Sequence, residues 1–333
     1  MTLELIVAFF MVGALIVYAL MGGADFGGGV WDFLATGPRA VQQKKAIAHA
    51  IGPIWEANHV WLILVIVLLF TGFPTAFAAM MTALNIPITL ILVGIVFRGS
   101  AFVFRKYDRR ADAVQQRWSL LFGLSSFFTP FMEGITVGAL ATGQIRVVDG
   151  RLVSGYLAGW LTPFAFACGT FAVVLFAFLA AVYLTVDTEG EPDLQEDFRR
   201  RALWSGVVLI PIGVLAFVTS KSGAPLIFDG LTRWWSPLLL GLTACLGVAA
   251  WFALWRRYFA IARAAAIGQV TMILCGWSLV QFPNFVTPDL TFSNSAAPQI
   301  TLRLLIIALG LGAVILLPSL YFLFRIFKGS GRP

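Results

Sequence analysis

The sequence predicts an all-α integral membrane protein, and its composition is what leads to that class. Of the 333 residues, 59% are hydrophobic and only 12% are charged, and the mean hydropathy is +0.89. Soluble domains carry roughly 25% charged residues. A soluble chain of this length could not bury so much apolar surface. Soluble enzymes, nucleic-acid-binding proteins and disulfide-rich secreted scaffolds are therefore excluded.

The predicted membrane spans follow from the lengths of the apolar runs. A transmembrane helix needs about 20 mostly apolar residues, and nine stretches of the sequence meet this requirement. They are residues 3–21, 50–71, 82–105, 117–142, 158–185, 201–220, 235–255, 258–282 and 301–327. The second and third spans are separated by Thr71-Gly72-Phe73-Pro74, because Gly and Pro interrupt a helix.

The orientation is predicted from the loop cations, which are enriched on the cytoplasmic side of membrane proteins. Of the 23 Lys and Arg residues, Arg98 lies within a span. One alternate set of loops holds only Arg146, Arg151, Lys221, Arg233 and Arg303, and the other set holds all the rest. The sequence therefore predicts a periplasmic N-terminus and a cytoplasmic C-terminus. The same bias explains the net charge of +7 without a polyanionic partner.

The spans are expected to form two four-helix bundles and one peripheral helix. Residues 1–145 would make the first bundle, residues 158–282 the second, and residues 301–327 the ninth helix. The loop at 187–201 mixes acidic residues with arginines and is interpreted as a solvated linker. Because the loops are short, no attached soluble domain is expected.

Neither a metal site nor a heme held by this chain alone is expected. The three cysteines, Cys168, Cys245 and Cys275, lie in apolar runs and show no CxxC spacing, so we interpret them as packing residues. The only histidines are His49 and His59. Ligation of a heme by two histidines from different spans would need another.

Four ionisable residues in or beside the predicted spans are candidate functional residues, because charge is costly in hydrocarbon. Asp25 follows the first span. With a helical rise of about 1.5 Å per residue, Glu56 and Arg98 lie ~9 and ~10 Å from the cytoplasmic ends of the second and third spans. Glu133 lies ~24 Å deep by the same measure. Glu56 and Arg98 are therefore expected to form a buried pair between neighbouring helices.

Three interpretations of these residues remain open. His59 lies one turn beyond Glu56, on the same helix face. The first interpretation is a proton relay from the cytoplasm through Asp25, Glu56 with Arg98, His59 and Glu133. The second is a structural clamp between Glu56 and Arg98, with Glu133 beside the helix kink that Pro130 causes. The third is an ion or substrate site.

Two motifs of the chain resemble the signatures of a known family, subunit II of the bacterial cytochrome bd quinol oxidases, including the cyanide-insensitive branch. The first is Tyr18-Ala-Leu-Met-Gly-Gly-Ala-Asp25-Phe-Gly-Gly-Gly29, whose glycines suit close helix approach. The second is Gly52-Pro-Ile-Trp-Glu56-Ala-Asn58-His59-Val-Trp61-Leu-Ile63. Phe97-Arg98-Gly99 and Arg117-Trp118 fit the same pattern. The resemblance extends to length, number of spans and orientation, and so covers the whole chain.

The resemblance implies function by association with a partner. In that family, subunit II pairs with a larger subunit I, which ligates two b-type hemes and heme d and oxidises quinol. Dioxygen is reduced to water with protons drawn from the cytoplasm, so the enzyme is an electrogenic translocase of the bacterial inner membrane. Subunit II holds no heme ligand, metal or catalytic residue. It helps to assemble the heme pair and lines part of the proton route. The resemblance leaves open a structural quinone or lipid and a small single-helix accessory subunit.

Residue by residue, the resemblance assigns the proton route to Asp25 and Glu56, with Arg98 as their charge partner. To this route we add His59 and Glu133 from the intramembrane positions, with Trp55, Asn58 and Trp61 as supporting motif residues. The chain departs from the family at three positions. Gly22 replaces the first Asp of the common Asp-Gly-Phe-Asp run, His59 stands where Gln is frequent, and Glu133 has no counterpart in the motif.

A stand-alone, proton-coupled secondary transporter with a site at Glu56, Arg98 and Glu133 is the alternative from another class. Transporters usually carry paired broken helices around a site at the membrane midplane. In this chain the intramembrane polar residues crowd the first four predicted spans, and the second four carry almost none. This asymmetry favours a subunit whose first bundle faces a partner.

Overall fold

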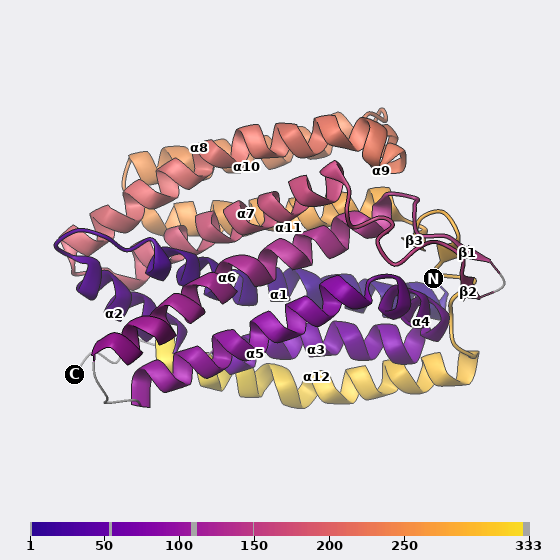
Figure 1. The fold of residues 1–333 in the computed structure, drawn as a ribbon, viewed down its shortest axis with the longest axis horizontal. Helices are drawn as coiled ribbons and strands as arrows, with labels where there is room; N and C mark the ends of the chain where they lie inside the picture. The colour runs from indigo at the N-terminus through magenta and orange to yellow at the C-terminus, as the bar shows by residue number, and fades with distance from the viewer. Residues whose placement is uncertain (1, 53–54, 108–111, 149, 329–333) are drawn as a thin grey trace.

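The computed structural model describes residues 2–52, 55–107, 112–148 and 150–328, and nine helices within these ranges are long and apolar enough to span a membrane. They are α1 (Leu3–Phe33), α3 (Trp55–Gly72), α5 (Asn85–Tyr107), α6 (Asp112–Ala141), α7 (Pro163–Asp187), α8 (Pro192–Gly223), α10 (Ser236–Trp255), α11 (Phe259–Gln281) and α12 (Gln299–Lys328). They lie alongside one another in an elongated bundle (Figure 1). The predicted all-α class and number of spans are confirmed for this part of the chain.

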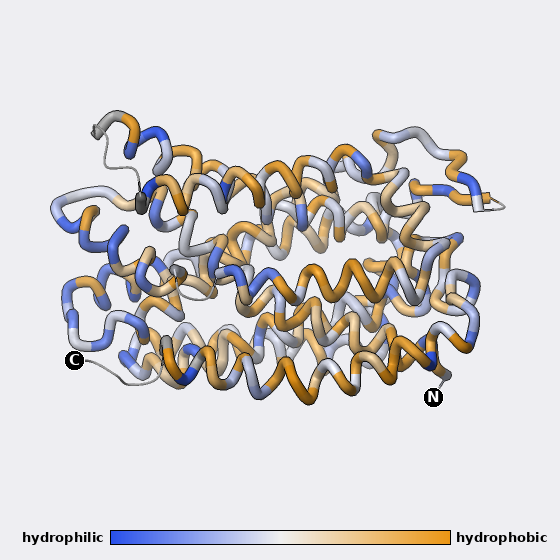
Figure 2. Tube along the Cα trace, turned by 90° about the horizontal axis from the view of Figure 1, so that it is seen from below, coloured by the Kyte–Doolittle hydropathy of each residue, from blue (hydrophilic) through white to orange (hydrophobic). Residues whose placement is uncertain are grey.

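The remaining elements are short and lie at the two ends of the bundle. They are α2 (Ala40–Ile51), α4 (Pro74–Ala83), α9 (Pro225–Leu231) and two antiparallel ladders, β1 (Val147–Val148) with β2 (Arg151–Leu152) and β3 (Asn284–Val286) with β4 (Leu290–Thr291). The ladders, α4 and α9 occupy one end, here called the strand end, and α2 occupies the other, the α2 end (Figure 1). Hydrophilic residues gather at both ends, with hydrophobic helix between them (Figure 2). Which end faces the cytoplasm stays a prediction.

The first helix is longer than the sequence predicted, and this changes the position of Asp25. The predicted span ended at residue 21, but α1 continues through the glycine run to Phe33. Asp25 therefore lies within the helix, about 12 Å from its end at 1.5 Å per residue, and not beside it. Each glycine weakens a helix interior by roughly 1 kcal/mol. Packing between helices offsets this loss.

The glycines of α1 allow two other helices to approach its backbone, as the sequence predicted. A Cβ atom on Gly27 would overlap the carbonyl oxygen of Phe176 in α7 and lie 2.8 Å from the Cβ of Ala180. A Cβ atom on Gly29 would overlap the hydroxyl of Ser126 in α6. Larger residues at these positions would push α6 and α7 away from α1.

The second predicted span, 50–71, begins later in the structure. The chain before it forms the separate helix α2, and the described part of α3 starts at Trp55. Pro53 and Ile54 of the second motif lie outside the described residues, as do the loop cations Arg109, Arg110 and Arg332. Glu56 consequently stands in the first described turn of α3.

The most enclosed helix is α7. It packs against α1, α6, α8 and α11, and 67% of the residues in its apolar 18-residue stretch are buried. The helix α12 packs against α1 and α3, and only 6% of the residues in its apolar stretch are buried. Because α1 packs against α7 as well as against α3 and α6, the division into bundles at 1–145 and 158–282 stays a prediction.

The predicted solvated linker at 187–201 is wrong. Only residues 188–191 connect α7 to α8, which begins at Pro192 and includes the rest of the segment. Proline is favoured in the first turn of a helix because its N–H would have no partner there. The acidic and basic residues of this segment are thus held on a helix, where they can meet fixed partners.

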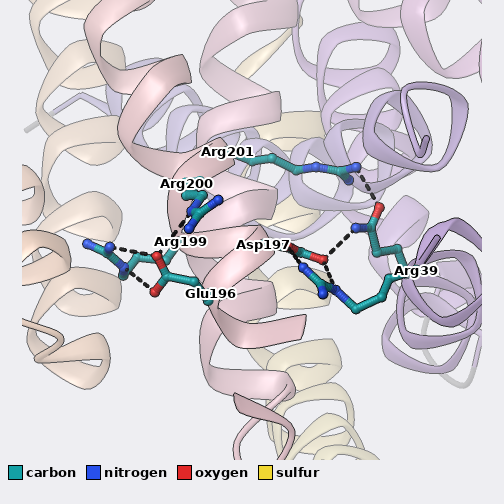
Figure 3. A network of polar contacts seen from close by, with 7 residues as sticks. Arg39, Glu196, Asp197, Arg199, Arg200 and Arg201 are labelled. Atoms are coloured by element: carbon teal, nitrogen blue, oxygen red, sulfur yellow. Dashed lines mark hydrogen bonds and ion pairs between the residues drawn. The ribbon is translucent and has the colours of Figure 1, made fainter. Parts of the chain in front are cut away.

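Ion pairs from α8 connect several elements at the α2 end (Figure 3). Asp197 accepts two hydrogen bonds from Arg39, of 2.8 and 2.6 Å, and one of 2.7 Å from Gln43. Arg201 donates to the amide oxygen of Gln43 at 2.6 Å. This group joins α8 to α2 and to the turn before it.

A second group on the same helix is centred on Glu196 (Figure 3). Arg199 donates to both of its carboxylate oxygens at 2.8 Å, and Arg200 donates at 3.2 Å. Arg257, between α10 and α11, lies 3.1 Å from the same carboxylate. The loop charges that the sequence showed therefore stabilise the helix ends against each other.

At the strand end, Asp289 holds the two ladders together. It accepts hydrogen bonds of 2.8 and 3.1 Å from Arg146 and one of 2.8 Å from the backbone N–H of Val147. The hydrogen bonds from Arg146 lower the pKa of the Asp289 carboxyl, and the backbone bond from Val147 acts in the same direction. The ionised carboxylate is therefore the form that the folded chain favours.

This contact predicts how stability at the strand end depends on pH. A carboxyl whose pKa is lower in the folded state than in the unfolded state stabilises the fold above its unfolded pKa of about 4, and this contribution is lost as the pH falls through the folded pKa. Asp289→Asn should lower the melting temperature at pH 7 and reduce the loss of stability on acidification below pH 4. Thermal unfolding in mild detergent at both pH values measures this. Asp229→Asn, at an exposed carboxylate on α9, is the control. Equal curves for the two variants would contradict the assignment.

Candidate functional site

Three polar side chains lie along one face of α1 at intervals of seven residues: Tyr18, Asp25 and Asp32. Seven residues are close to two turns, so the three side chains point the same way and are separated by about 10 Å each. Each meets a polar partner from α3, α5 or α6. We call these groups the Tyr18 layer, the Asp25 layer and the Asp32 layer.

The Asp25 layer is the most enclosed. The carboxylate of Asp25 accepts a hydrogen bond of 2.6 Å from the side-chain amide of Asn58. Arg98 donates from Nη2 to the backbone carbonyl of Asp25 at 2.9 Å and from Nε to Ser126 at 3.2 Å. Exposed fractions of 5% for Asp25, 1% for Asn58 and 2% for Arg98 show that all three are buried.

The guanidinium of Arg98 is also held by aromatic rings. Its central carbon lies 4.7 Å from the ring centre of Phe26 and 5.2 Å from that of Phe122. Stacking on ring faces is favourable for a guanidinium, and more so where water is excluded. Arg98 therefore places a fixed positive charge close to Asp25, between α1, α5 and α6.

The Asp32 layer lies toward the α2 end. Both carboxylate oxygens of Asp32 accept hydrogen bonds from Nη1 of Arg105, at 2.9 and 2.8 Å, and the Asp32 side chain is fully buried. The central carbon of Arg105 lies 4.8 Å from the ring centre of Phe122. Arg105 and Arg98 therefore both lie within cation–π distance of the ring of Phe122.

The Tyr18 layer lies toward the strand end. The hydroxyl of Tyr18 donates to Glu133 of α6 at 2.6 Å. A Cβ atom on Gly22 would lie 2.7 Å from Cε2 of Tyr18, so the tyrosine ring occupies the space that a side chain at position 22 would take. The departure from the family at Gly22 thus makes room for the tyrosine that holds Glu133.

The predicted pair between Glu56 and Arg98 is wrong. Arg98 is buried against α1 and α6, whereas Glu56 is exposed on the outer side of α3. In the part of the chain that the structure describes, Glu56 forms no ion pair. The sequence predicted similar depths for Glu56 and Arg98, but depth does not fix the direction of a side chain. Glu56 and Asn58 are two residues apart on α3 and therefore do not face the same way. Asn58 faces α1, so Glu56 faces outward.

His59 does not continue a ladder from Glu56. Its Nδ1 lies 2.8 Å from the backbone carbonyl of Trp55, one turn earlier in α3. Its ring centre lies 6.2 Å from that of Tyr18, 5.7 Å from Phe26 and 6.1 Å from Trp55. Edge-to-face contacts of this kind are favourable between aromatic rings. His59 therefore packs beside the Asp25 and Tyr18 layers.

The proton relay predicted in the order Asp25, Glu56, His59, Glu133 does not match the structure. The polar groups instead form the Tyr18, Asp25 and Asp32 layers along α1. The sequence analysis did not single out Asp32, Arg105, Ser126 or Tyr18 as site residues. The signal for two of them was present: Asp32 follows Asp25 on α1 by seven residues, and Arg105 follows Arg98 on α5 by seven residues. Arg105 was counted among the loop cations, because the third span was predicted to end there.

The two histidines are placed differently. His49 is exposed on α2, whereas Nδ1 of His59 lies against the backbone carbonyl of Trp55 within α3. Among the described residues, no three His, Cys, Asp or Glu side chains lie close enough together to hold a metal ion. The layers instead alternate acidic groups with hydrogen-bond donors and a fixed cation, which is an arrangement suited to holding and passing protons.

Comparison with known proteins gives a consistent result. The family model described as cytochrome bd terminal oxidase subunit II matches residues 3–327. Two proteins of Bacillus subtilis (strain 168), a putative cytochrome bd menaquinol oxidase subunit II and a cytochrome bd ubiquinol oxidase subunit 2, are 23% and 27% identical to the chain. The alignments cover 96% and 95% of this chain and 94% of each relative.

A shorter match and a solved structure agree with these relatives. The cytochrome bd-I ubiquinol oxidase subunit 2 of Escherichia coli (strain K12) is 29% identical over 56% of this chain and 49% of its own length. A chain of the bd oxidase from Geobacillus thermodenitrificans matches the fold with a TM-score of 0.78. That match covers 98% of this chain and 99% of the other, at 23% identity.

The burial of Arg98 predicts a large loss of folded protein when it is replaced. Breaking a buried charge interaction by removing one member costs on the order of 3 kcal/mol or more, because the other group is left uncompensated. Arg98→Leu should therefore sharply reduce the yield of monodisperse protein extracted in mild detergent. Arg303→Leu, at an exposed position on α12, is the matched control and should leave the yield unchanged. A normal yield for Arg98→Leu would show that Asp25 does not depend on this cation.

Proposed function

The chain belongs to the cytochrome bd terminal oxidase subunit II family, and we propose that it acts as the subunit of a quinol:O2 oxidoreductase that ligates no heme. It is a multi-pass protein of the bacterial inner membrane. In this proposal it stabilises the heme pair of subunit I and lines part of a proton route from the cytoplasm to the site of O2 reduction. The N-terminus is periplasmic and the C-terminus cytoplasmic, as the loop cations favour.

The exposure of Glu56 is the observation that carries this proposal. Glu56 lies on the outer side of a helix long enough to span the membrane, and the exposed residues of the next turns are apolar: Val60, Ile63 and Val67. A carboxylate facing lipid at this level is costly, because hydrocarbon cannot solvate it. Subunit I covers this face of α3 and brings Glu56 to the interface between the subunits.

The hemes belong to subunit I in this proposal. Heme b and heme d, when bound there, supply the electron transfer from quinol and the reduction of dioxygen to water. This chain contributes the surface of α3 on which subunit I assembles. A structural quinone or lipid and a small single-helix accessory subunit are further components that the complex can hold.

The proton route combines the interface with the interior of the first four spans. Glu56 serves at the interface, and Asp25, His59 and Glu133 serve in the interior, with Arg98 as the charge that holds Asp25 in place. Residues 1–145 form the bundle that faces subunit I, residues 158–282 form a second bundle, and residues 301–327 are the peripheral helix. The alternative of a stand-alone, proton-coupled transporter is not favoured, because the chain belongs to an oxidase family.

The first experiment is purification of the complex through a tag on this chain, followed by a reduced-minus-oxidised visible spectrum. We expect a second large membrane chain and heme b bands, and a far-red band if heme d is present. A colourless preparation of this chain alone would contradict the proposed function.

The exposure of Glu56 also predicts a defect in turnover without loss of heme. Glu56→Leu removes a proton-carrying group, which should lower quinol oxidase turnover by at least about tenfold, since proton transfer groups contribute this much or more. The heme spectrum should be retained, because no heme ligand is changed. Turnover with a soluble quinol and the heme content per complex are the two measurements.

Two variants serve as controls for Glu56. Glu56→Asp keeps the carboxylate and should restore most of the turnover. Asp229→Leu removes an exposed carboxylate at the strand end and should have no effect. Unchanged turnover in Glu56→Leu would remove Glu56 from the proton route and leave it a contact residue.

A further inference from the structure

Two buried polar atoms near the Asp25 layer lack hydrogen-bond partners. One is Oδ1 of Asn58, an acceptor, and the other is Nε1 of Trp61, a donor. The other end of the Asn58 amide is already engaged by the carboxylate of Asp25. The two atoms are complementary in kind, and their residues are three apart on α3.

The position of these atoms follows from helix geometry. Residues three apart lie on the same helix face, about one turn from each other. Because α3 runs antiparallel to α1, Trp61 lies ~4.5 Å closer to the strand end than Asn58, at 1.5 Å per residue. Tyr18 lies about 10 Å from Asp25 in the same direction. Trp61 and Tyr18 also pack in one hydrophobic cluster, together with Phe26.

The gap between the Asp25 layer and the Tyr18 layer therefore lies at Trp61. On α1 this interval carries Gly22, which is buried against the ring of Tyr18 and has no side chain to offer a polar group. The two unpartnered atoms lie at this level, between Asp25 and the hydrogen bond from Tyr18 to Glu133.

Leaving both atoms unpartnered would destabilise the fold. A buried donor or acceptor without a partner loses its hydrogen bonds to water and gains nothing in exchange. Buried water molecules in proteins are found at such places, where they bind two to four polar groups. One water molecule can accept from Trp61 and donate to Asn58 at the same time.

We propose that a single buried water molecule binds between Oδ1 of Asn58 and Nε1 of Trp61 and joins the Asp25 layer to the Tyr18 layer. The binding site rests on the two unpartnered atoms alone, and its role in proton transfer rests on the proposed function. Trp61 and Asn58 act here as positioning residues. The indole N–H is a donor only and cannot accept a proton.

The transfer that this water allows conserves every atom. A proton from the carboxyl group of Asp25 passes to the water, and the water gives another of its protons to the hydroxyl oxygen of Tyr18. Tyr18 passes its own hydroxyl proton to the carboxylate of Glu133. At the end the water and Tyr18 are unchanged, Asp25 is ionised and Glu133 is protonated.

The site is tested first by a cryo-EM map of the purified oxidase complex at a resolution that shows ordered water elsewhere in this chain. We expect one density peak within hydrogen-bond distance of both Asn58 Oδ1 and Trp61 Nε1. A map that shows buried water elsewhere but none between these atoms would overturn the proposal. This test does not depend on the proton route.

The role of the water is tested by Trp61→Phe, which keeps an aromatic ring and removes the N–H. Turnover should fall roughly tenfold, the equivalent of one hydrogen bond in the transfer path, and the solvent deuterium isotope effect should rise. Trp118→Phe is the matched control, because Nε1 of Trp118 on α6 is also buried and unpartnered but lies outside the three layers. Equal behaviour of the two variants would overturn the role of the water.

Glu133→Gln separates this proposal from the proposed function. If Glu133→Gln lowers turnover and Trp61→Phe does not, Glu133 receives its protons by another path and the bridging role is wrong. If neither variant has an effect while the water is visible in the map, the site stands and the route through Glu133 is wrong.

Discussion

Hydrocarbon offers no partner to a charged or hydrogen-bonding side chain, and this constraint organises the first half of the chain around α1. Three polar side chains on one face of α1 must be met by protein groups, and α3, α5 and α6 supply Asn58, Arg98, Arg105 and Glu133. The glycines on α1 let α6 and α7 come close enough for this. The polar layers and the tight packing are therefore two aspects of one requirement.

The second half of the described chain has a different role. Its helices bring few polar side chains into the bundle, and α7 forms an apolar wall against α1 and α6. The charges of α8 lie at the α2 end, where Glu196 and Asp197 join α8 to α2 and to the turn between α10 and α11. This framework holds the helix ends in place, whereas the buried polar contacts lie among α1, α3, α5 and α6.

The class, the number of spans and the close approach at Gly27 followed from the sequence, because apolar length and small residues are local properties. The pairing of Glu56 with Arg98 did not follow, because sequence spacing gives depth and not direction. In a soluble helix the polar face reveals which side is outside. In a membrane helix both sides are apolar, so nothing in the pattern around Glu56 and Asn58 shows which of the two faces α1. Asp32 was missed because it lay beyond the predicted end of the first span, and α1 continues further than the apolar run. Arg105 was missed because it was the last residue of the predicted third span and was counted among the loop cations.

The outward position of Glu56 has a consequence for a copy of this chain that has not yet met a partner. In a bare bilayer its carboxylate must draw water into the membrane or lift the start of α3 toward the headgroups. Each of these changes marks the lone chain as different from the assembled one.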